Sequence, residues 1–362
     1  MKMRRIGRAV AAATAAVLAG SVVAGCGSPA DTASDGMAPE AMCPTAETEG
    51  TLQIAMSSPL AVFAPLLLAL QTDAFAGTGI DVAIEPIKSA ESLPLMARGQ
   101  LDAQITSLTA GHFNTVSAGV PVKWIAPMDK QQPVPAGEPV AGYWARADKV
   151  GSATDPDLAA LQGARVSTPT NGSGISGLIL DNKLSSVGLG IEDVTLTAPL
   201  VGADALTGLA NGSVDVAWVS APLEVQAATY PDLVPLAGYE PGITGTSLIV
   251  GPGMLNRPEV TVKFLQVLRQ VTDEYLQGDY RTDENTVQLL AEAEQTDPET
   301  IREAALLSFD SSFDMAGAAP FADRFQEFSL QRDELEYTDP LDSAQLVDTR
   351  FAEALAICEN VV

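Results

Sequence analysis

Histidine, cysteine, aromatic and basic residues are all scarce in this chain of 362 residues. It contains one histidine, three cysteines and 5% aromatic residues, with 20 Lys and Arg against 46 Asp and Glu. A single histidine and the lack of a Cys-x-x-Cys pair argue against a metal centre. The lack of a Gly-x-Ser-x-Gly elbow, and of a cysteine left over as a nucleophile, argues against an enzyme. The net charge of −26 argues against nucleic acid as a partner. We therefore expect neither a cofactor nor catalysis.

Residues 1–25 have the pattern of a cleaved secretory leader. A basic start is followed by the apolar run Ala9–Ala24, which is too short and too Ala-rich to be a lasting membrane span. The sequence Val23-Ala24-Gly25-Cys26 resembles the bacterial lipobox. This resemblance implies that Cys26 is the first mature residue, that it carries lipid, and that the protein is anchored on the extracytoplasmic face of the cell membrane. An ordinary secretory signal with an incidental cysteine is the alternative. Removal of the leader takes the net charge to about −30.

Residues 26–50 are rich in Ser, Ala, Pro, Thr and acidic residues, which predicts a flexible tether. With Cys26 assigned to lipid, Cys43 and Cys358 remain, and in an oxidising compartment they would most simply form one disulfide. Two unpaired thiols are the alternative. Such a bond would close nearly the whole domain, with an expected upper gain of roughly 4–5 kcal/mol.

From Thr51 onward, short strand patterns alternate with helical ones, which is typical of mostly parallel sheets flanked by helices. Two Pro- and Gly-rich segments, Pro133–Pro139 and Glu240–Gly245, read as crossings between two lobes. We expect one lobe from 51–139 and 246–362, and a second lobe from 140–245. After Pro258 the pattern becomes helical, with helices expected over Val260–Gln277, Glu284–Ala293, Pro298–Ser308, Phe321–Leu330 and Ser343–Ile357.

One unit of the sequence occurs twice. Residues 97–103 (Ala-Arg-Gly-Gln-Leu-Asp-Ala) match residues 210–216 (Ala-Asn-Gly-Ser-Val-Asp-Val), 113 positions later. Each copy follows a helix pattern and precedes a strand that ends in Ser or Thr. Two such units predict two lobes of like design, each with the C-terminal edge of its strands facing a crevice.

The stretch Arg165–Leu178 combines a strand, several hydroxyl residues, an Asn-Gly-Ser-Gly turn and the start of a helix. Free backbone N–H groups and the positive end of a helix dipole would meet there and suit a small polar or anionic group. An ordinary strand-to-helix connection capped by Ser173 is the alternative.

In their order and spacing, these features resemble the type II solute-binding proteins of ABC importers, in the branch for sulfonate, taurine, nitrate and thiamine-precursor-like ligands. The matching pieces include Gly79–Val82, Gly99–Asp102, Ser117–Val122, Asp157–Gly163, Val166–Gly174, Gly212–Asp215 and Val347–Phe351. The resemblance implies the type II periplasmic-binding-protein fold, two lobes that close on a solute, and an ABC permease with its ATPase as partners. It also implies ligand contacts at strand ends and helix starts, namely Ser57, Ser58, Pro59, Ser89, Ser107, Leu108, Thr109, Thr168, Thr170, Asn171, Gly172, Ser173, Gly174, Ala203, Asp204, Trp218 and Ser220.

Two positions bear on the ligand. Many relatives have Trp-Glu-Pro where this chain has Ser220-Ala221-Pro222, but Trp218 lies two positions earlier and would point the same way as Ser220. His112, at an expected helix start, is either a cleft donor or a surface or capping residue. The expected cleft is neutral, which favours a small organic solute over a bare oxyanion. We expect a monomeric binding protein; a ligand-sensing or scaffold protein with the same fold, but without transport, is the alternative.

Overall fold

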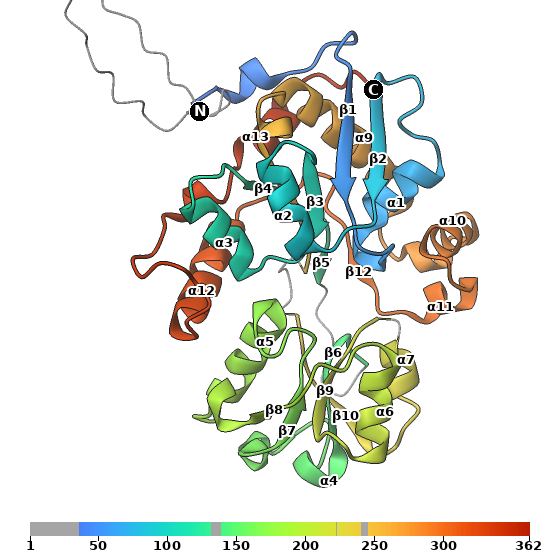
Figure 1. Ribbon diagram of the computed structural model, residues 1–362. Helices are drawn as coiled ribbons and strands as arrows, with labels where there is room; N and C mark the ends of the chain where they lie inside the picture. Colours follow the sequence, from blue (N-terminus) through green and yellow to red (C-terminus); the bar gives the residue numbers. More distant parts are fainter. Residues whose placement is uncertain (1–35, 132–138, 222, 240–244) are drawn as a thin grey trace, which may run out of the picture. The chain divides into compact units, whose positions relative to one another are not determined.

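The computed structural model describes residues 36–131, 139–221, 223–239 and 245–362, and it shows two five-stranded sheets with helices around them (Figure 1). The predicted leader, the predicted lipidation site Cys26 and nearly all of both predicted crossings lie outside the described residues. No described helix has the length and apolar composition of a membrane span.

The first sheet has the strand order β2-β1-β3-β11-β4. Strand β1 pairs in parallel with β2 and β3, whereas β11 lies antiparallel between β3 and β4. The strands are β1 (Gly50–Ala55), β2 (Ile80–Glu85), β3 (Ala103–Thr106), β4 (Lys123–Pro127) and β11 (Ser247–Val250).

The second sheet repeats this arrangement in the order β8-β7-β9-β6-β10. Strand β7 pairs in parallel with β8 and β9, and β6 lies antiparallel between β9 and β10. The strands are β6 (Gly142–Arg146), β7 (Arg165–Ser167), β8 (Thr195–Leu196), β9 (Val216–Val219) and β10 (Leu233–Gly238). Each sheet therefore mixes parallel and antiparallel pairs, because the first strand after each crossing, β6 or β11, enters its sheet from the opposite direction. We call the parts built on these sheets the first lobe and the second lobe.

The repeated sequence unit has the same structural role in both lobes. Asp102 precedes β3 and accepts a hydrogen bond from the backbone N–H of Gln53 in β1 at 2.8 Å. Asp215 precedes β9 and accepts one from the backbone N–H of Arg165 in β7 at 2.9 Å. Each carboxylate also pairs with an arginine of its own lobe, Asp102 with Arg257 and Asp215 with Arg165. The shared Gly-x-x-Asp pattern thus joins the central strand of each sheet to its neighbour.

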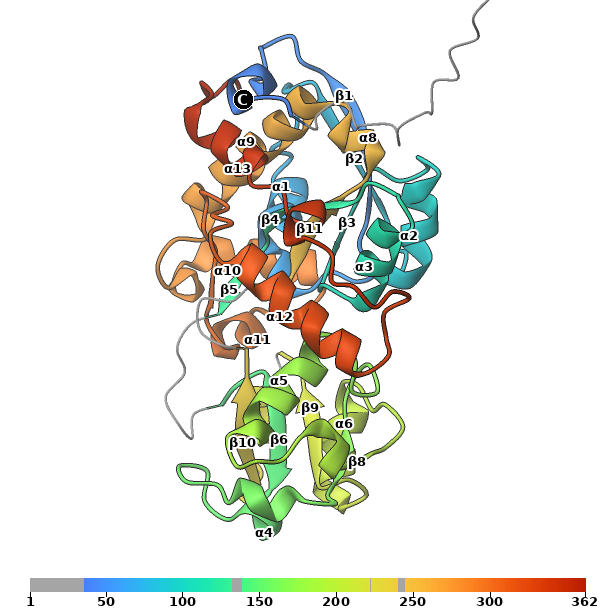
Figure 2. The same cartoon turned by 90° about the vertical axis from the view of Figure 1, so that its left-hand side faces the viewer.

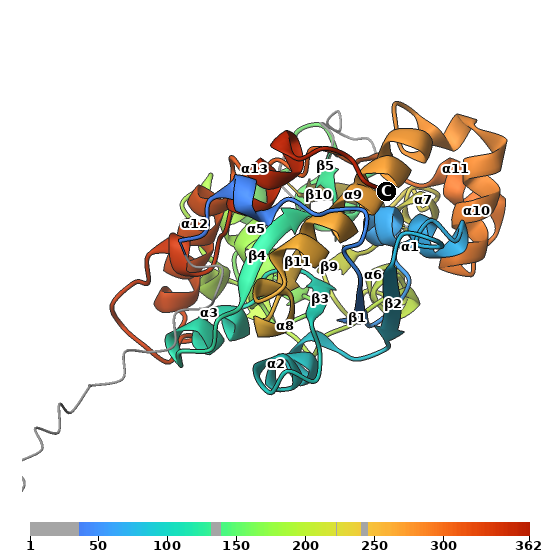
Figure 3. The same cartoon turned by 90° about the horizontal axis from the view of Figure 1, so that it is seen from above.

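Helices cover both faces of the first sheet. Helices α1 and α9 pack in one apolar cluster with Leu52 and Ile54, and α2 and α3 belong to a second cluster on the other face (Figure 2). Figure 3 shows α9 over the strands, between α1 and α13. The helices of this lobe are α1 (Ala64–Gln71), α2 (Ser89–Ala97), α3 (Ala110–Ser117), α8 (Pro252–Leu255), α9 (Pro258–Tyr275), α10 (Glu284–Glu294), α11 (Pro298–Glu303), α12 (Ala318–Gln331) and α13 (Arg350–Ile357).

The second sheet is also covered on both faces, by α5 on one and α6 on the other. Its helices are α4 (Ala147–Val150), α5 (Gly174–Ser185), α6 (Ala203–Asn211) and α7 (Leu223–Ala227). A small antiparallel pair joins β5 (Lys130–Gln131) to β12 (Leu307–Ser308). Short 3-10 helices are η1 (Pro39–Met42), η2 (Ala61–Phe63), η3 (Leu158–Leu161), η4 (Ile191–Asp193), η5 (Tyr280–Thr282) and η6 (Ser343–Gln345).

The C-terminal helices differ from the expected ones mainly at their ends. The helix expected over Ser343–Ile357 is η6 followed by α13, and the one expected over Pro298–Ser308 ends at Glu303 before the strand β12. Asp283 caps α10 by accepting a hydrogen bond from the Thr286 N–H at 2.8 Å. Lys88 is the N-cap of α2, and Ser89 is its first helical residue.

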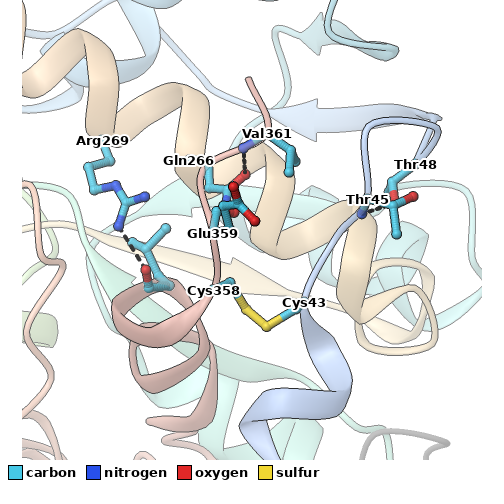
Figure 4. Close-up of a disulfide and its surroundings, with 9 residues drawn as sticks. Cys43, Thr45, Thr48, Gln266, Arg269, Cys358, Glu359 and Val361 are labelled. Carbon is cyan, nitrogen blue, oxygen red and sulfur yellow. Dashed lines mark hydrogen bonds between the residues drawn. A yellow bond between two sulfur atoms is a disulfide. The ribbon is translucent and has the colours of Figure 1, made fainter.

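Part of the predicted tether is folded onto the first lobe. Met42 is fully buried, and Cys43 forms a disulfide with Cys358, as predicted (Figure 4). The buried Lys263 of α9 donates hydrogen bonds to the carbonyls of Thr45, Ala46 and Thr48 at 2.8–3.3 Å. The prediction of a flexible tether is therefore wrong for residues 37–49, because three backbone acceptors and the disulfide fix a segment whose composition alone looks flexible.

Candidate functional site

The predicted site positions of the first lobe follow the C-terminal ends of β1 and β3, two neighbouring parallel strands. Ser57 and Ser58 are exposed just after β1, and Pro59 and Thr109 are half-buried. Ser107 donates a hydrogen bond through Oγ to the Gly245 carbonyl at 2.8 Å, and Leu108 is fully buried in the apolar core. Ser89 differs from the others, since its Oγ is buried and has no hydrogen-bond partner among the described residues.

His112 is fully buried, and its hydrogen bonds define its proton position. The backbone N–H of Thr109 donates to His112 Nδ1 at 3.0 Å, so this nitrogen is an acceptor and the proton of the neutral ring is on Nε2. Nε2 lies 2.6 Å from the side-chain amide of Gln104. A ring N–H requires an acceptor there. Because the oxygen and nitrogen of a glutamine amide can exchange places by a half-turn, we assign the Gln104 carbonyl oxygen to His112 and its amino group to Ser92.

This orientation gives every member of the network a partner. The Gln104 amino group donates to Ser92 Oγ, and Ser92 donates to the Ser89 carbonyl at 2.9 Å. Burial lowers the pKa of His112 to about 4, so the ring is neutral at pH 7. His112 therefore caps α3 and connects it by hydrogen bonds to Gln104 of β3 and, through Gln104, to Ser92 of α2. Of the two roles considered from the sequence, the structure supports the capping role. We do not include it among the proposed ligand contacts.

The loop that joins β7 to α5 directs most of its hydroxyl groups to itself. The Gly172 N–H donates to the buried Thr168 Oγ1, Thr170 Oγ1 donates to the Ser173 carbonyl, and Ser173 Oγ donates to the Thr170 carbonyl. Ser173 is the N-cap of α5 but makes no side-chain cap bond. Asn171 and Thr170 remain exposed, whereas Gly172 and Gly174 are buried. The loop is thus a self-bonded turn with a small exposed tip.

Trp218 connects the predicted positions of the two lobes through two tyrosines that sequence reasoning did not select. Its ring packs edge-to-face on Tyr143, with centroids 5.1 Å apart, and on Tyr239, with centroids 5.5 Å apart. The Tyr239 side chain in turn hydrogen-bonds Ser107 of the first lobe, and burial raises the pKa of its hydroxyl. Trp218 at the end of β9, Tyr239 after β10 and Ser107 after β3 therefore meet where strands of both lobes end. The sequence did contain one indication of this role, since Tyr239 is an aromatic residue directly before the expected crossing Glu240–Gly245.

Helix α12 also contributes to this junction. Phe321 and Phe325 of α12 share one apolar cluster with Trp124 of the first lobe and Ile175 of the second. A cavity of about 10 Å³, room for roughly one water molecule, remains there. Its lining is Ile175, Leu178, Ile179, Asn182, Tyr239, Phe321 and Arg324. The lobes are therefore in close apolar contact beside Tyr239.

No hydrogen bond or ring contact between described residues joins the remaining predicted positions of the second lobe to this junction. Ala203 and Asp204 are exposed at the start of α6, and Ser220 is exposed after β9. Among the described residues, no His, Cys, Asp and Glu side chains form a group that could hold a metal ion. The candidate site thus combines hydroxyl and aromatic groups with apolar walls, and Asn182 and Arg324 also line its cavity.

The fold is that of known periplasmic solute-binding proteins. The alkanesulfonate-binding protein SsuA from Xanthomonas axonopodis pv. citri bound to MOPS superposes with a TM-score of 0.59 at 17% identity, covering 83% of this chain and 99% of that one. The periplasmic aliphatic sulphonate binding protein SsuA from Escherichia coli superposes with a TM-score of 0.61 at 17% identity, covering 82% of this chain and 97% of that one. The periplasmic nitrate-binding protein NrtA from Synechocystis PCC 6803 superposes with a TM-score of 0.61 at 11% identity, covering 85% of this chain and 88% of that one.

No curated protein matches the chain in sequence. A family model does match residues 61–278, more than half of the chain, and its description is "NMT1/THI5 like". The match includes the sequence repeat and the junction formed by Ser107, Trp218 and Tyr239. It also includes every strand of the two five-stranded sheets except β1. The chain therefore belongs to the NMT1/THI5-like family.

Proposed function

We propose that this protein is the extracytoplasmic solute-binding lipoprotein of an ABC importer. It takes a small organic solute between its lobes and delivers it to a membrane permease and its ATPase. The observation that supports this most is the junction at which Ser107, Tyr239 and Trp218 bring strand ends of both lobes into contact. A solute bound there touches both lobes, so it stabilises the closed arrangement through contacts that the open one lacks.

The side chains at the junction favour a neutral solute with hydrogen-bonding groups. None of the proposed contact residues is Lys or Arg, and Lys130, at the start of the first crossing, is paired with Asp310 at 2.6 Å. The cavity lining adds one cation, Arg324, and the proposed contacts include one anion, Asp204. Ser89 Oγ is buried and has no hydrogen-bond partner among the described residues, and the Tyr239 hydroxyl stays protonated because burial raises its pKa. These groups supply hydrogen bonds rather than charge, so the sulfonate and nitrate named for the similar structures are not the solutes we expect.

The anchoring, the partners and the lack of catalysis belong to the same proposal. Lipid on Cys26 would hold a monomer at the extracytoplasmic face of the cell membrane, with residues 27–36 as the remaining tether. The three cysteines are then used by the lipid and by the disulfide, which leaves no thiol for an enzyme.

A thermal-shift screen of the purified protein tests the binding role. The test compounds are neutral pyrimidines and other small neutral organic solutes. Sulfonates, short carboxylates, aromatic acids and nitrate are the charged compounds for comparison. A ligand of the folded state stabilises it by about 2.7 kcal/mol at a hundredfold excess over Kd. We expect a neutral solute to raise Tm, and we expect the shift to shrink in Ser89→Ala but not in the exposed control Ser186→Ala. No shift across the panel would contradict the importer function and favour a sensor or scaffold.

A further inference from the structure

Glu224 of the second lobe is a buried carboxylate that bonds the first lobe. It lies in α7 and is 0% exposed. Its Oε1 accepts a hydrogen bond from the backbone N–H of Ala305 at 3.1 Å, in the segment between α11 and β12. Its Oε2 is buried and has no hydrogen-bond partner among the described residues. A buried carboxylate with one oxygen unsatisfied is costly, so this group needs an explanation that packing alone does not provide.

The peptide that Glu224 binds is held from its other side as well. Arg281 of η5 donates a hydrogen bond through Nη1 to the Ala304 carbonyl at 2.6 Å. Ala304 C=O and Ala305 N–H belong to one peptide group, so a cation and a carboxylate bind its two ends. Asp279 fixes the Arg281 guanidinium at 2.8 Å. The first lobe therefore presents a rigid, polarised N–H to Glu224.

We propose that Glu224 is a latch between the lobes, and that its proton controls how strongly the lobes stay closed. The ionised carboxylate gains one hydrogen bond but loses its water, whereas the protonated group loses far less on burial. Closure therefore favours the protonated form, and opening favours the ionised form. The effect on solute affinity rests on the proposed function, because affinity scales with the fraction of protein in the competent state. The closure itself does not depend on a solute.

The charged groups of the neighbouring elements leave Glu224 without an ion pair. They are Arg281 in η5 and its N-cap Asp279, Arg302 and Glu303 in α11, Asp204 in α6, and the Lys130–Asp310 pair beside β12. None of them, and no other described residue, forms an ion pair with Glu224. Burial raises the pKa of Glu224 above its ordinary value of 4.5, which is the expected direction for a closed latch.

The sign of the pH effect follows from this shift. The closed state has the higher pKa and binds the proton more tightly, so a fall in pH from above the raised pKa toward 4.5 favours closure. The closed-to-open ratio rises about tenfold for each unit by which the two pKa values differ. Below 4.5 the carboxyl is protonated in both states, and the ratio no longer changes through this group.

Spin labels on exposed positions of the two lobes, Gln100→Cys and Ser186→Cys, test the latch in the full protein without solute. The distance distribution is measured by electron paramagnetic resonance between pH 8 and pH 5. We expect the shorter-distance population to grow as the pH falls. Glu224→Gln keeps the oxygen that accepts from Ala305 but cannot ionise, so it should show the short distance at both pH values. Glu192→Gln, an exposed glutamate of the same lobe, is the control and should behave like wild type.

A distribution that does not change with pH in wild type would overturn the proposal, and so would an equal response in wild type and Glu224→Gln. A protein that binds no solute in the thermal-shift screen but shows the expected distance change would contradict the importer function and support the latch. The two proposals therefore fail by different measurements.

Discussion

The single histidine predicts a specific loss of stability in acid. His112 is fully buried, and its folded-state pKa of about 4 lies below the ordinary value of 6.5. Protonation would put a second proton on Nδ1, directly opposite the Thr109 N–H that now donates to it. The folded protein therefore binds this proton more weakly than the unfolded chain. The stability from His112 is complete above pH 6.5 and is lost as the pH falls through 4.

The size of the effect follows from the shift. At 1.36 kcal/mol for each pKa unit, a drop from 6.5 to about 4 corresponds to about 3 kcal/mol of unfolding free energy. Urea unfolding of wild type and His112→Gln at half-unit steps between pH 8 and pH 4 measures it. Glutamine can accept from the Thr109 N–H and does not titrate. Above pH 7 the unfolding free energies of the two proteins should differ by a constant amount. By pH 4 the unfolding free energy of wild type should have fallen by about 3 kcal/mol more than that of the variant.

Two results would refute this reasoning. One is a difference between wild type and His112→Gln that stays constant, within about 1 kcal/mol, from pH 8 to pH 4. The other is a nitrogen NMR spectrum of the sole histidine that shows the proton on Nδ1. Either result would mean that the Thr109 N–H and Gln104 do not hold the ring as described.

Three further predictions concern stability. Asp215→Asn and Asp102→Asn should each lower the unfolding free energy by about 2 kcal/mol, because each removes a charged acceptor of a neighbouring strand's N–H; urea unfolding measures this, and a neutral result for both would contradict their shared role. Reduction of Cys43–Cys358 should lower Tm, with roughly 4–5 kcal/mol as the upper limit for so long a loop, and an unchanged Tm with reductant would contradict a stabilising role. Gly177→Ala should cost about 2 kcal/mol in urea unfolding, because a Cβ there would overlap the Gly172 carbonyl; an undiminished stability would contradict this packing.

Features that depend on local patterns could be predicted from the sequence. The repeat around Asp102 and Asp215 reappears as the same strand order in both sheets, because each copy ends a helix and begins a strand within a few residues. The bonds of the two carboxylates are not local, since they join strands 49 and 50 residues earlier in the chain. The pairing of Cys43 with Cys358 followed from counting the cysteines. The family resemblance rested on the order of such pieces, and the family model and the similar structures confirm it.

Features that depend on distant partners could not be predicted. The spacing of Phe321 and Phe325 indicates an apolar helix face, but not that it packs against α5 of the other lobe. Whether His112 binds a ligand or caps a helix depends on Gln104, which lies on another element. The segment 37–49 has the composition of a tether, but Lys263, more than 200 residues later, fixes its carbonyls. In each case the deciding group lies on another element of the structure, and for the tether segment it is more than 200 residues away in the sequence.

The most direct test of the solute-binding account is a calorimetric titration of the purified protein with the solute that gives the largest thermal shift. Trp218→Ala is titrated beside wild type, because Trp218 packs on Tyr239 at the junction of the lobes. The account predicts one site per chain and a loss of at least tenfold in affinity in the variant, which corresponds to about 1.4 kcal/mol. Equal affinity in the two proteins would contradict the site, and no saturable heat with any solute would contradict the binding function.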